Sequence, residues 1–266
     1  MTTVIESKQN TTLRHLARLA REKKYRQGAG EMVCEGGKML GEALGSGVRI
    51  RTVLLRAGEE FPAAVRADID RAAAQGTRIF ETSAPLFEQA SDVETPQGLL
   101  FACEPPHRQA DDLPQTLSGA VLLDGVQDPG NLGTILRTAD AFGLDAVILC
   151  EGCTDWTAPK VVRATMGAAF RQPVYRMPLG EAMAAMRARG LPVYAAALDT
   201  DSVPITEVPL SPAAVIVGNE GRGVTQQALE QSDRKVIIPM AGRAESLNAG
   251  VAAAILIWEM TKGALR

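Results

Sequence analysis

Three loops in the second half of this 266-residue sequence combine glycines with polar side chains, and each follows an apolar run. Glycines after a buried strand allow a ligand to approach the backbone closely. None of the three loops has the G-x-G-x-x-G order of a dinucleotide site or the G-K-S/T of a phosphate loop. They therefore predict a ligand site of another kind. The loops are DPGNLGTILRTA (128–139), VGNEGRGV (217–224) and IPMAGRAESLNAG (238–250).

Helical geometry sets the direction of Arg137 in the first loop. Asn131 is a suitable N-cap, and apolar residues recur after it at helical spacing. A rotation of about 100° per residue places Arg137 nearly opposite the apolar face, one turn after Gly133. Because helical side chains lean toward the N-terminus, we expect its guanidinium over Gly133, pointing toward residues 128–131. The alternative is an ordinary surface arginine after a strand–helix turn.

The third loop connects a strand that ends at Pro239 to a long apolar helix from about Ser246. Ser246 is a suitable N-cap for that helix. The helix is rich in alanine and isoleucine on much of its circumference, which indicates burial and is typical of a subunit interface. Capping alone is the alternative role of Ser246 and Asn248.

Apolar runs predict the sheet that positions these loops. Helical segments separate most of the runs, and this alternation indicates a parallel sheet covered on both faces. Ligands of such sheets usually lie beyond the carboxyl ends of the strands. The expected strands are 120–123, 146–150, 174–176, 193–197, 213–217 and 236–238.

A smaller α/β domain is expected before this sheet. The prediction places this domain at 1–104, a proline-rich and charged linker at 105–117, and the second domain at 118–266. The first helix is expected at 12–26. Further helices are expected at 38–44, 61–74 and 84–90, and strands at 31–36, 50–56, 77–80 and 98–104.

The charge of the sequence limits the kinds of partner that the protein can bind. The formal net charge is −3, which argues against a protein that binds nucleic acid over its whole surface. Residues 1–27 nevertheless hold seven basic side chains against Glu6 and Glu22. This basic end indicates a local contact with an anion such as RNA, and a solvated helix face is the alternative.

The four cysteines suggest buried reduced thiols. Cys150 and Cys153 form one C-x-x-C without a second pair or a nearby histidine, whereas a zinc site needs four ligands. No apolar run is long enough to span a bilayer, and the first residues lack the apolar core of a signal peptide. We expect a cytoplasmic protein without a membrane partner.

The three loops, in this order and at this spacing, resemble the signature motifs of the SpoU/TrmH family of RNA ribose 2′-O-methyltransferases, in the SPOUT superfamily. The segment PKVVRATMGAAF (159–170) looks like a family segment, and residues 6–44 are similar to the ribosomal-protein-like substrate-binding domain of ribosomal RNA members. The resemblance therefore implies that the domain at 1–104 is an RNA substrate-binding domain. The resemblance implies an α/β fold with a deep C-terminal trefoil knot. It also implies S-adenosylmethionine as cofactor and a homodimer in which the partner chain completes each site.

The resemblance also implies roles for individual residues. The family's polar active-site positions match Asn131, Arg137, Glu220, Ser246 and Asn248, with Arg137 implicated in catalysis. Its cofactor positions match Gly218, Asn219, Ile238, Met240 and Leu247. RNA contacts are expected from Arg14, Arg18, Lys23, Lys24, Arg26 and Arg163, and no metal is expected. The chain departs from the family at Ala249-Gly250, where Val-Ser is frequent, and at Thr165, where serine is usual.

The implied reaction asks the protein to align a ribose oxygen behind the activated methyl group and to help remove the hydroxyl proton. An arginine is a poor base because its pKa lies above about 12. We therefore favour Arg137 as a clamp for an RNA phosphate or for the developing alkoxide, with the proton passing to phosphate or water. Arg137 as the base is the alternative.

The N-terminal domain favours 23S ribosomal RNA as the substrate, with transfer RNA as the alternative. Two rivals come from other classes: a catalytically silent RNA-binding or ribosome-assembly protein, and a nucleotide-dependent oxidoreductase. The complete polar set argues against the first rival. The order of the glycines argues against the second.

Overall fold

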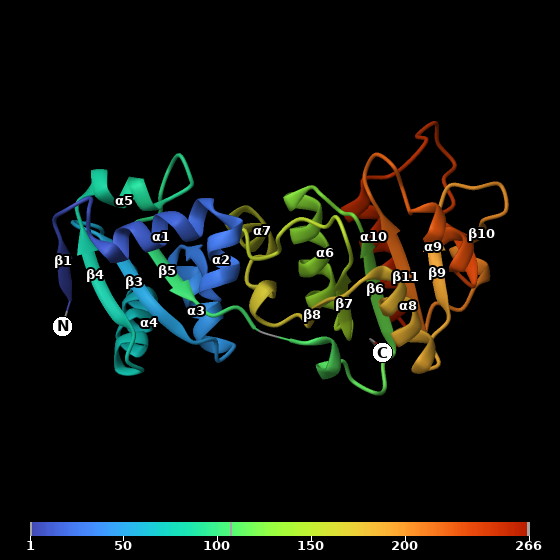
Figure 1. Cartoon of the computed structure of the whole chain (residues 1–266), viewed down its shortest axis with the longest axis horizontal. Helices are drawn as coiled ribbons and strands as arrows, with labels where there is room; N and C mark the ends of the chain where they lie inside the picture. The colour runs from blue at the N-terminus through green and yellow to red at the C-terminus, as the bar shows by residue number, and fades with distance from the viewer. Residues whose placement is uncertain (1, 107, 265–266) are drawn as a thin grey trace. The chain divides into compact units, whose positions relative to one another are not determined.

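The computed structural model describes residues 2–106 and 108–264, and its internal contacts divide the chain into two compact units (Figure 1). The N-terminal unit comprises Met1–His107 and Asp155–Arg171, and the C-terminal unit comprises Arg108–Thr154 and Gln172–Arg266. This grouping differs from the predicted boundaries at residues 155–171. These residues join the N-terminal unit because Asp155 and Arg163 form ion pairs with its side chains.

The N-terminal unit has a five-stranded mixed sheet in the order β1-β4-β3-β5-β2. Strand β5 is antiparallel to β2 and β3, whereas β4 is parallel to β1 and β3. The strands are β1 (Thr3–Ile5), β2 (Met32–Glu35), β3 (Ile50–Arg56), β4 (Arg78–Thr82) and β5 (Leu99–Cys103). Its helices are α1 (Thr11–Arg21), α2 (Lys23–Ala29), α3 (Gly37–Gly45), α4 (Ala63–Ala74), α5 (Ala84–Ala90) and α7 (Pro159–Thr165), with a 3-10 turn at Ala168–Phe170.

The helix predicted at 12–26 is two helices. Asn10 caps α1 by accepting hydrogen bonds from the backbone N–H groups of Thr12 at 2.9 Å and Leu13 at 3.3 Å. The chain leaves helical geometry at Glu22, with φ −110° and ψ 104°, and then starts α2. The sequence does not reveal this break, because Arg21 and Lys23 on its two sides both have good helix propensity.

The C-terminal unit has a seven-stranded sheet in the order β10-β12-β9-β11-β6-β7-β8, and every pairing in it is parallel. This confirms the predicted parallel sheet. The strands are β6 (Gly119–Asp124), β7 (Ala146–Leu149), β8 (Val174–Arg176), β9 (Val193–Ala196), β10 (Val203–Pro204), β11 (Ala213–Gly218) and β12 (Arg234–Ile237). Its helices are α6 (Pro129–Phe142), α8 (Leu179–Ala188), α9 (Gln226–Gln231) and α10 (Ala249–Thr261), with 3-10 turns at Ala110–Asp112 and Ile205–Glu207.

The register of β6 and β11 positions the first two loops. The two strands are neighbours, and Asp124 at the end of β6 pairs with Gly218 at the end of β11. All six residues of β6 and the first five of β11 are buried, which fits their continuous apolar sequence. The first and second loops therefore leave the same edge of the sheet side by side.

No helix within the described residues is long and apolar enough to cross a membrane. The four cysteines are buried and unbridged, as expected. Burial raises the pKa of the Cys103, Cys150 and Cys153 thiols, so these groups stay protonated at neutral pH. Buried neutral thiols are poor nucleophiles, so they take no part in the site described below.

Candidate active site

Glu220 of the second loop holds the first loop in place. Its Oε1 accepts hydrogen bonds from the Asn131 side-chain amide at 2.9 Å and the Asp128 backbone N–H at 3.0 Å. Its Oε2 accepts one from the Gln127 backbone N–H at 3.1 Å. A single carboxylate thus fixes three donors of the segment that opens α6.

These hydrogen bonds decide the ionisation of Glu220. Partial burial would raise the pKa of its carboxyl group, but the hydrogen bonds from Asn131, Asp128 and Gln127 outweigh burial and lower that pKa. Glu220 is therefore an anion at neutral pH and acts as an acceptor.

The Asn131 side chain links all three loops. Its Nδ2 donates to Glu220, and its Oδ1 accepts from Asn248 Nδ2 at 2.8 Å. Asn248 Oδ1 in turn accepts from the Val251 N–H at 3.2 Å and caps α10. Since an ionised carboxylate only accepts, each amide in this chain has one possible orientation.

Two predicted N-caps are corrected by this arrangement. Asp128, not Asn131, caps α6, because its Oδ1 accepts from the Asn131 N–H at 2.8 Å. Asn248, not Ser246, caps α10. Asn131 therefore lies inside the first turn of α6 and is only 7% exposed, which leaves its side chain available to join the loops.

The second loop is a tight hairpin whose shape depends on Gly218. The backbone N–H and C=O groups of Asn219 and Gly223 pair with each other at 2.9 Å. A Cβ atom on Gly218 would lie 2.2 Å from the Gly223 carbonyl carbon and the Val224 nitrogen, which is a clash with backbone. Asn219 Nδ2 also donates to the Gly125 carbonyl at 2.8 Å and ties the hairpin to the end of β6.

A cavity of about 480 Å³ lies between this hairpin and the third loop. The carboxyl ends of β9, β11 and β12 contribute to its wall, where ligands of parallel sheets usually bind. The proposed active-site residues Glu220 and Ser246 also line it. All five residues expected to hold the cofactor lie on its wall: Gly218, Asn219, Ile238, Met240 and Leu247.

Arg137 lies outside the hydrogen-bond network that joins Asn131, Glu220 and Asn248. Its side chain is exposed in α6, as helical geometry predicted, and Gly133 is buried. Within the described residues Arg137 makes no hydrogen bond or ion pair. Its guanidinium is therefore available to an anion from outside the chain.

The six side chains expected to contact RNA differ in their exposure and in whether they already have a partner within the chain. Arg14, Lys23 and Lys24 are exposed. Arg18 donates two hydrogen bonds to Glu22 at 3.0 Å and lies 3.8 Å from the centre of the Tyr25 ring. Arg163 is half-buried and donates to Asp92 at 2.7 Å.

Arg26 has a structural role that its sequence position did not indicate. It is 5% exposed, and its Nε and Nη2 donate to Asp155 at 3.1 and 2.8 Å. Its Nη1 also donates to the Leu19 carbonyl at 2.8 Å, in the last turn of α1. We therefore do not count Arg26 among the side chains open to RNA.

Sequence reasoning missed Asp124 as a site residue. It is 5% exposed, and its Oδ2 accepts from the Thr225 N–H at 2.8 Å, which fastens the end of the second loop to β6. A carboxylate directly after a buried apolar run was the available signal. Among the described residues, no group of three or more His, Cys, Asp or Glu side chains is arranged to hold a metal ion.

Family comparisons agree with this geometry. Residues 119–258 match the model of the SpoU rRNA Methylase family, and residues 10–101 match the MRM3-like substrate binding domain. Over 96% of its length, the chain is 37% identical to the 23S rRNA (guanosine(2553)-2'-O)-methyltransferase RlmP of Bacillus subtilis (strain 168), 98% of which is covered.

Solved structures show the same fold. An AdoMet-bound rRNA methyltransferase from Sinorhizobium meliloti has a TM-score of 0.89 and 29% identity, over 100% of this chain and 99% of that one. The SpoU methyltransferase AviRb from Streptomyces viridochromogenes has a TM-score of 0.84 and 27% identity, over 95% and 97%.

Fold and site together define a methyltransferase built on a parallel α/β sheet. The chain belongs to the SpoU rRNA methylase family. The predicted family, fold class, enzyme class and cofactor, S-adenosylmethionine, are thereby confirmed. The trefoil knot, the homodimer and the roles of individual residues stay predictions.

Proposed function

We propose that this protein methylates a ribose 2′-hydroxyl of 23S ribosomal RNA. The observation that carries the proposal is the hydrogen-bond chain from Glu220 through Asn131 to Asn248, which brings all three family motifs together beside one cavity. The relative from Bacillus subtilis, named for this reaction on 23S rRNA, supports the choice of substrate.

The residues around the cavity fit S-adenosylmethionine. Its hairpin wall is backbone-rich at Gly218 and Asn219, which suits hydrogen bonding by main-chain groups, and Ile238, Met240 and Leu247 supply apolar surface. When bound, the cofactor supplies a methyl group activated by the positive sulfur. The clash that any side chain at Gly218 would have with the Gly223 and Val224 backbone explains why this hairpin requires glycine there.

Arg137 would meet the RNA. Its exposed guanidinium has no partner in the described chain, so it can take two oxygens of a phosphate or stabilise the developing alkoxide. Asn131 holds the start of the same helix against Glu220, and this contact positions Arg137 through α6. The proton of the hydroxyl would pass to phosphate or water. Exposed Arg14, Lys23 and Lys24 would contact RNA phosphates elsewhere.

A homodimer completes the proposal. Val251 is 47% and Trp258 45% exposed, and they lie seven residues apart on one face of α10. The Trp258 ring meets the Phe142 ring of α6 edge-on, with centroids 5.2 Å apart. This apolar face would pack against a second copy of the chain. We also propose that the C-terminal segment of this unit forms the trefoil knot, which the similarity to SpoU structures supports.

The dimer is tested by light scattering of Val251→Asp, because aspartate in the first turn suits the helix dipole and spares the fold. Val4→Asp makes the same substitution at another exposed valine, in the N-terminal unit, and serves as the control. We expect a monomer for the first variant only. Dimers of unchanged stability from both variants would contradict this interface.

The activity itself is tested by incubating the protein with labelled S-adenosylmethionine and 23S rRNA or transfer RNA. Methylated nucleosides are then identified by mass spectrometry after digestion. We expect one 2′-O-methylnucleoside from 23S rRNA. Methylation of transfer RNA alone would replace the substrate, and cofactor binding without transfer to any RNA would identify a silent RNA-binding protein.

A further inference from the structure

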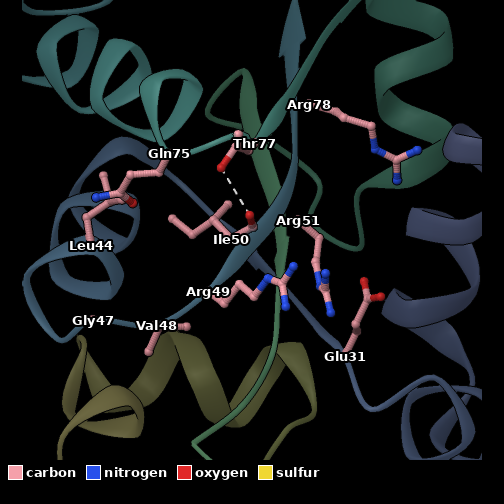
Figure 2. A pocket seen from close by; sticks show the side chains of 11 residues that line it. Glu31, Leu44, Gly47, Val48, Arg49, Ile50, Arg51, Gln75, Thr77 and Arg78 are labelled. Atoms are coloured by element: carbon pink, nitrogen blue, oxygen red, sulfur yellow. Dashed lines mark hydrogen bonds between the residues drawn. The ribbon is translucent and has the colours of Figure 1, made fainter.

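The N-terminal unit contains a cavity of about 650 Å³ that none of the expected site residues lines (Figure 2). The start of β3, the end of α3 and the turn between α4 and β4 form its walls. Three of its lining residues are arginines, Arg49, Arg51 and Arg78, and Glu31 is the one acidic residue among them.

Two of the arginines lie on either side of one buried residue. Arg49 and Arg51 flank Ile50, which is 7% exposed, whereas Arg49 is exposed and Arg51 is half-buried. Figure 2 shows both guanidinium groups on the side of the cavity where the Glu31 carboxylate lies. Arg78 enters from the start of β4 and donates to Thr52 Oγ1 at 3.4 Å.

The charged side chains of this cavity differ in whether they have a partner within the chain. Arg51 forms an ion pair with Glu104. Glu31 is held by His15, whose Nε2 lies 3.0 Å from Glu31 Oε2. The Arg49 side chain is exposed and makes no hydrogen bond or ion pair with any described residue. A concave site with an excess of one charge concentrates the opposite charge, even on a chain whose net charge is −3.

We propose that this cavity binds a phosphate group of the RNA backbone, with Arg49 as its principal ligand and Arg51 beside it. The proposal rests on the function proposed above and extends it to a second contact. Among the described residues that line the cavity none is aromatic, so bases have no ring there to stack on. Recognition would therefore go through phosphate, which a guanidinium can hold with two parallel hydrogen bonds. Such a contact positions the RNA without reading its sequence.

The test compares Arg49→Gln with Arg66→Gln in the full chain. Arg66 is exposed near the start of α4 and does not line the cavity, so the control makes the same charge change elsewhere in the unit. Binding of a fluorescently labelled 23S rRNA fragment is measured by anisotropy at several salt concentrations. Methyl transfer is measured separately, so RNA binding is scored whether or not the protein turns over.

We expect Arg49→Gln to weaken RNA binding about three- to tenfold and to reduce the slope of log affinity against log salt by about 0.7–0.9, the effect of one lost phosphate contact. The KM for RNA should rise while kcat and the melting temperature stay unchanged. Arg49→Lys, which keeps the charge, should recover part of the affinity.

Equal affinities and salt slopes for Arg49→Gln and Arg66→Gln would overturn the inference and leave the proposed function standing. Absence of methyl transfer by the wild type would instead contradict the proposed function. The anisotropy measurement would still show whether the cavity binds RNA. Arg49-dependent binding of ATP, with unchanged RNA binding, would assign the cavity to a free nucleotide and also overturn the inference.

Discussion

Glu220 and Asn131 are 89 residues apart in the chain, yet their side chains form a hydrogen bond of 2.9 Å. This contact joins the loop after β11 to the loop after β6, and Asn248 extends the connection to the loop before α10. The three family motifs are thus one hydrogen-bonded structure rather than three separate turns. This structure holds the start of α6, the helix that carries Arg137, against the second and third loops.

Asn131→Asp should disrupt this structure more than its small size change suggests. The new carboxylate would face the Glu220 carboxylate, and neither group can donate when both are ionised. We expect lower stability to urea and a methyl-transfer rate at least about tenfold below wild type. A tenfold lower rate corresponds to a loss of about 1.4 kcal/mol in transition-state stabilisation, which is the scale of one buried hydrogen bond. Activity equal to wild type would show that Asn131 does not position the loop.

The pH dependence of stability should report on Glu220. Because the pKa of folded Glu220 lies below its ordinary value of 4.5, its carboxylate stabilises the fold above that pH. This contribution is lost as pH falls through the folded pKa. Glu220→Gln lacks the titration, so the stability advantage of wild type over the variant should shrink below about pH 4.5. Urea unfolding of both proteins between pH 7 and 3 measures the difference, and a constant difference would contradict the assignment.

Gly218→Ala should abolish binding of S-adenosylmethionine, because the added methyl would clash with backbone 2.2 Å away. Gly221 in the same hairpin is the matched control. A Cβ atom there would meet only Asn219 Oδ1, at an ordinary 3.7 Å. Isothermal titration calorimetry compares the two variants, and we expect Gly221→Ala to retain binding. Equal affinities would mean that the hairpin backbone does not shape the cofactor site.

Arg26→Ala should destabilise the protein by about 3–5 kcal/mol, the usual effect of leaving one partner of a buried ion pair alone. Chemical denaturation measures this loss. Arg14→Ala, a change at an exposed arginine of α1, should change stability little and raise the KM for RNA instead. If Arg26→Ala left stability unchanged and raised only the KM, Arg26 would belong to the RNA contacts after all.

Much of the fold follows from sequence because its strands are continuous apolar runs. The buried runs of β6 and β11 lie between loops with strong turn residues, so both the elements and their parallel arrangement are predictable. The strands β1 and β10 were missed. They have three and two residues, too few for any periodicity, and they lie at the edges of their sheets.

The misassigned side chains share one physical cause. Asn131 and Arg26 both satisfy the usual local patterns, one as a cap and the other as an exposed basic residue. Their actual partners, Glu220 and Asp155, are 89 and 129 residues away. Local patterns carry no information about such partners. The sequence could not predict for the same reason that Arg49 and Arg78 line one cavity, since they lie at the starts of two separate strands, β3 and β4.

Ribose methylation through Arg137 is tested most directly by methyl transfer to 23S rRNA by wild type and Arg137→Ala, with 2′-O-methylnucleosides counted by mass spectrometry. We predict one modified ribose with wild type, and a loss of at least about 100-fold in kcat with Arg137→Ala, the usual scale for removing a transition-state donor. Binding of S-adenosylmethionine should be unchanged. Full 2′-O-methylation by Arg137→Ala, or methylation of a base instead of a ribose, would contradict the account.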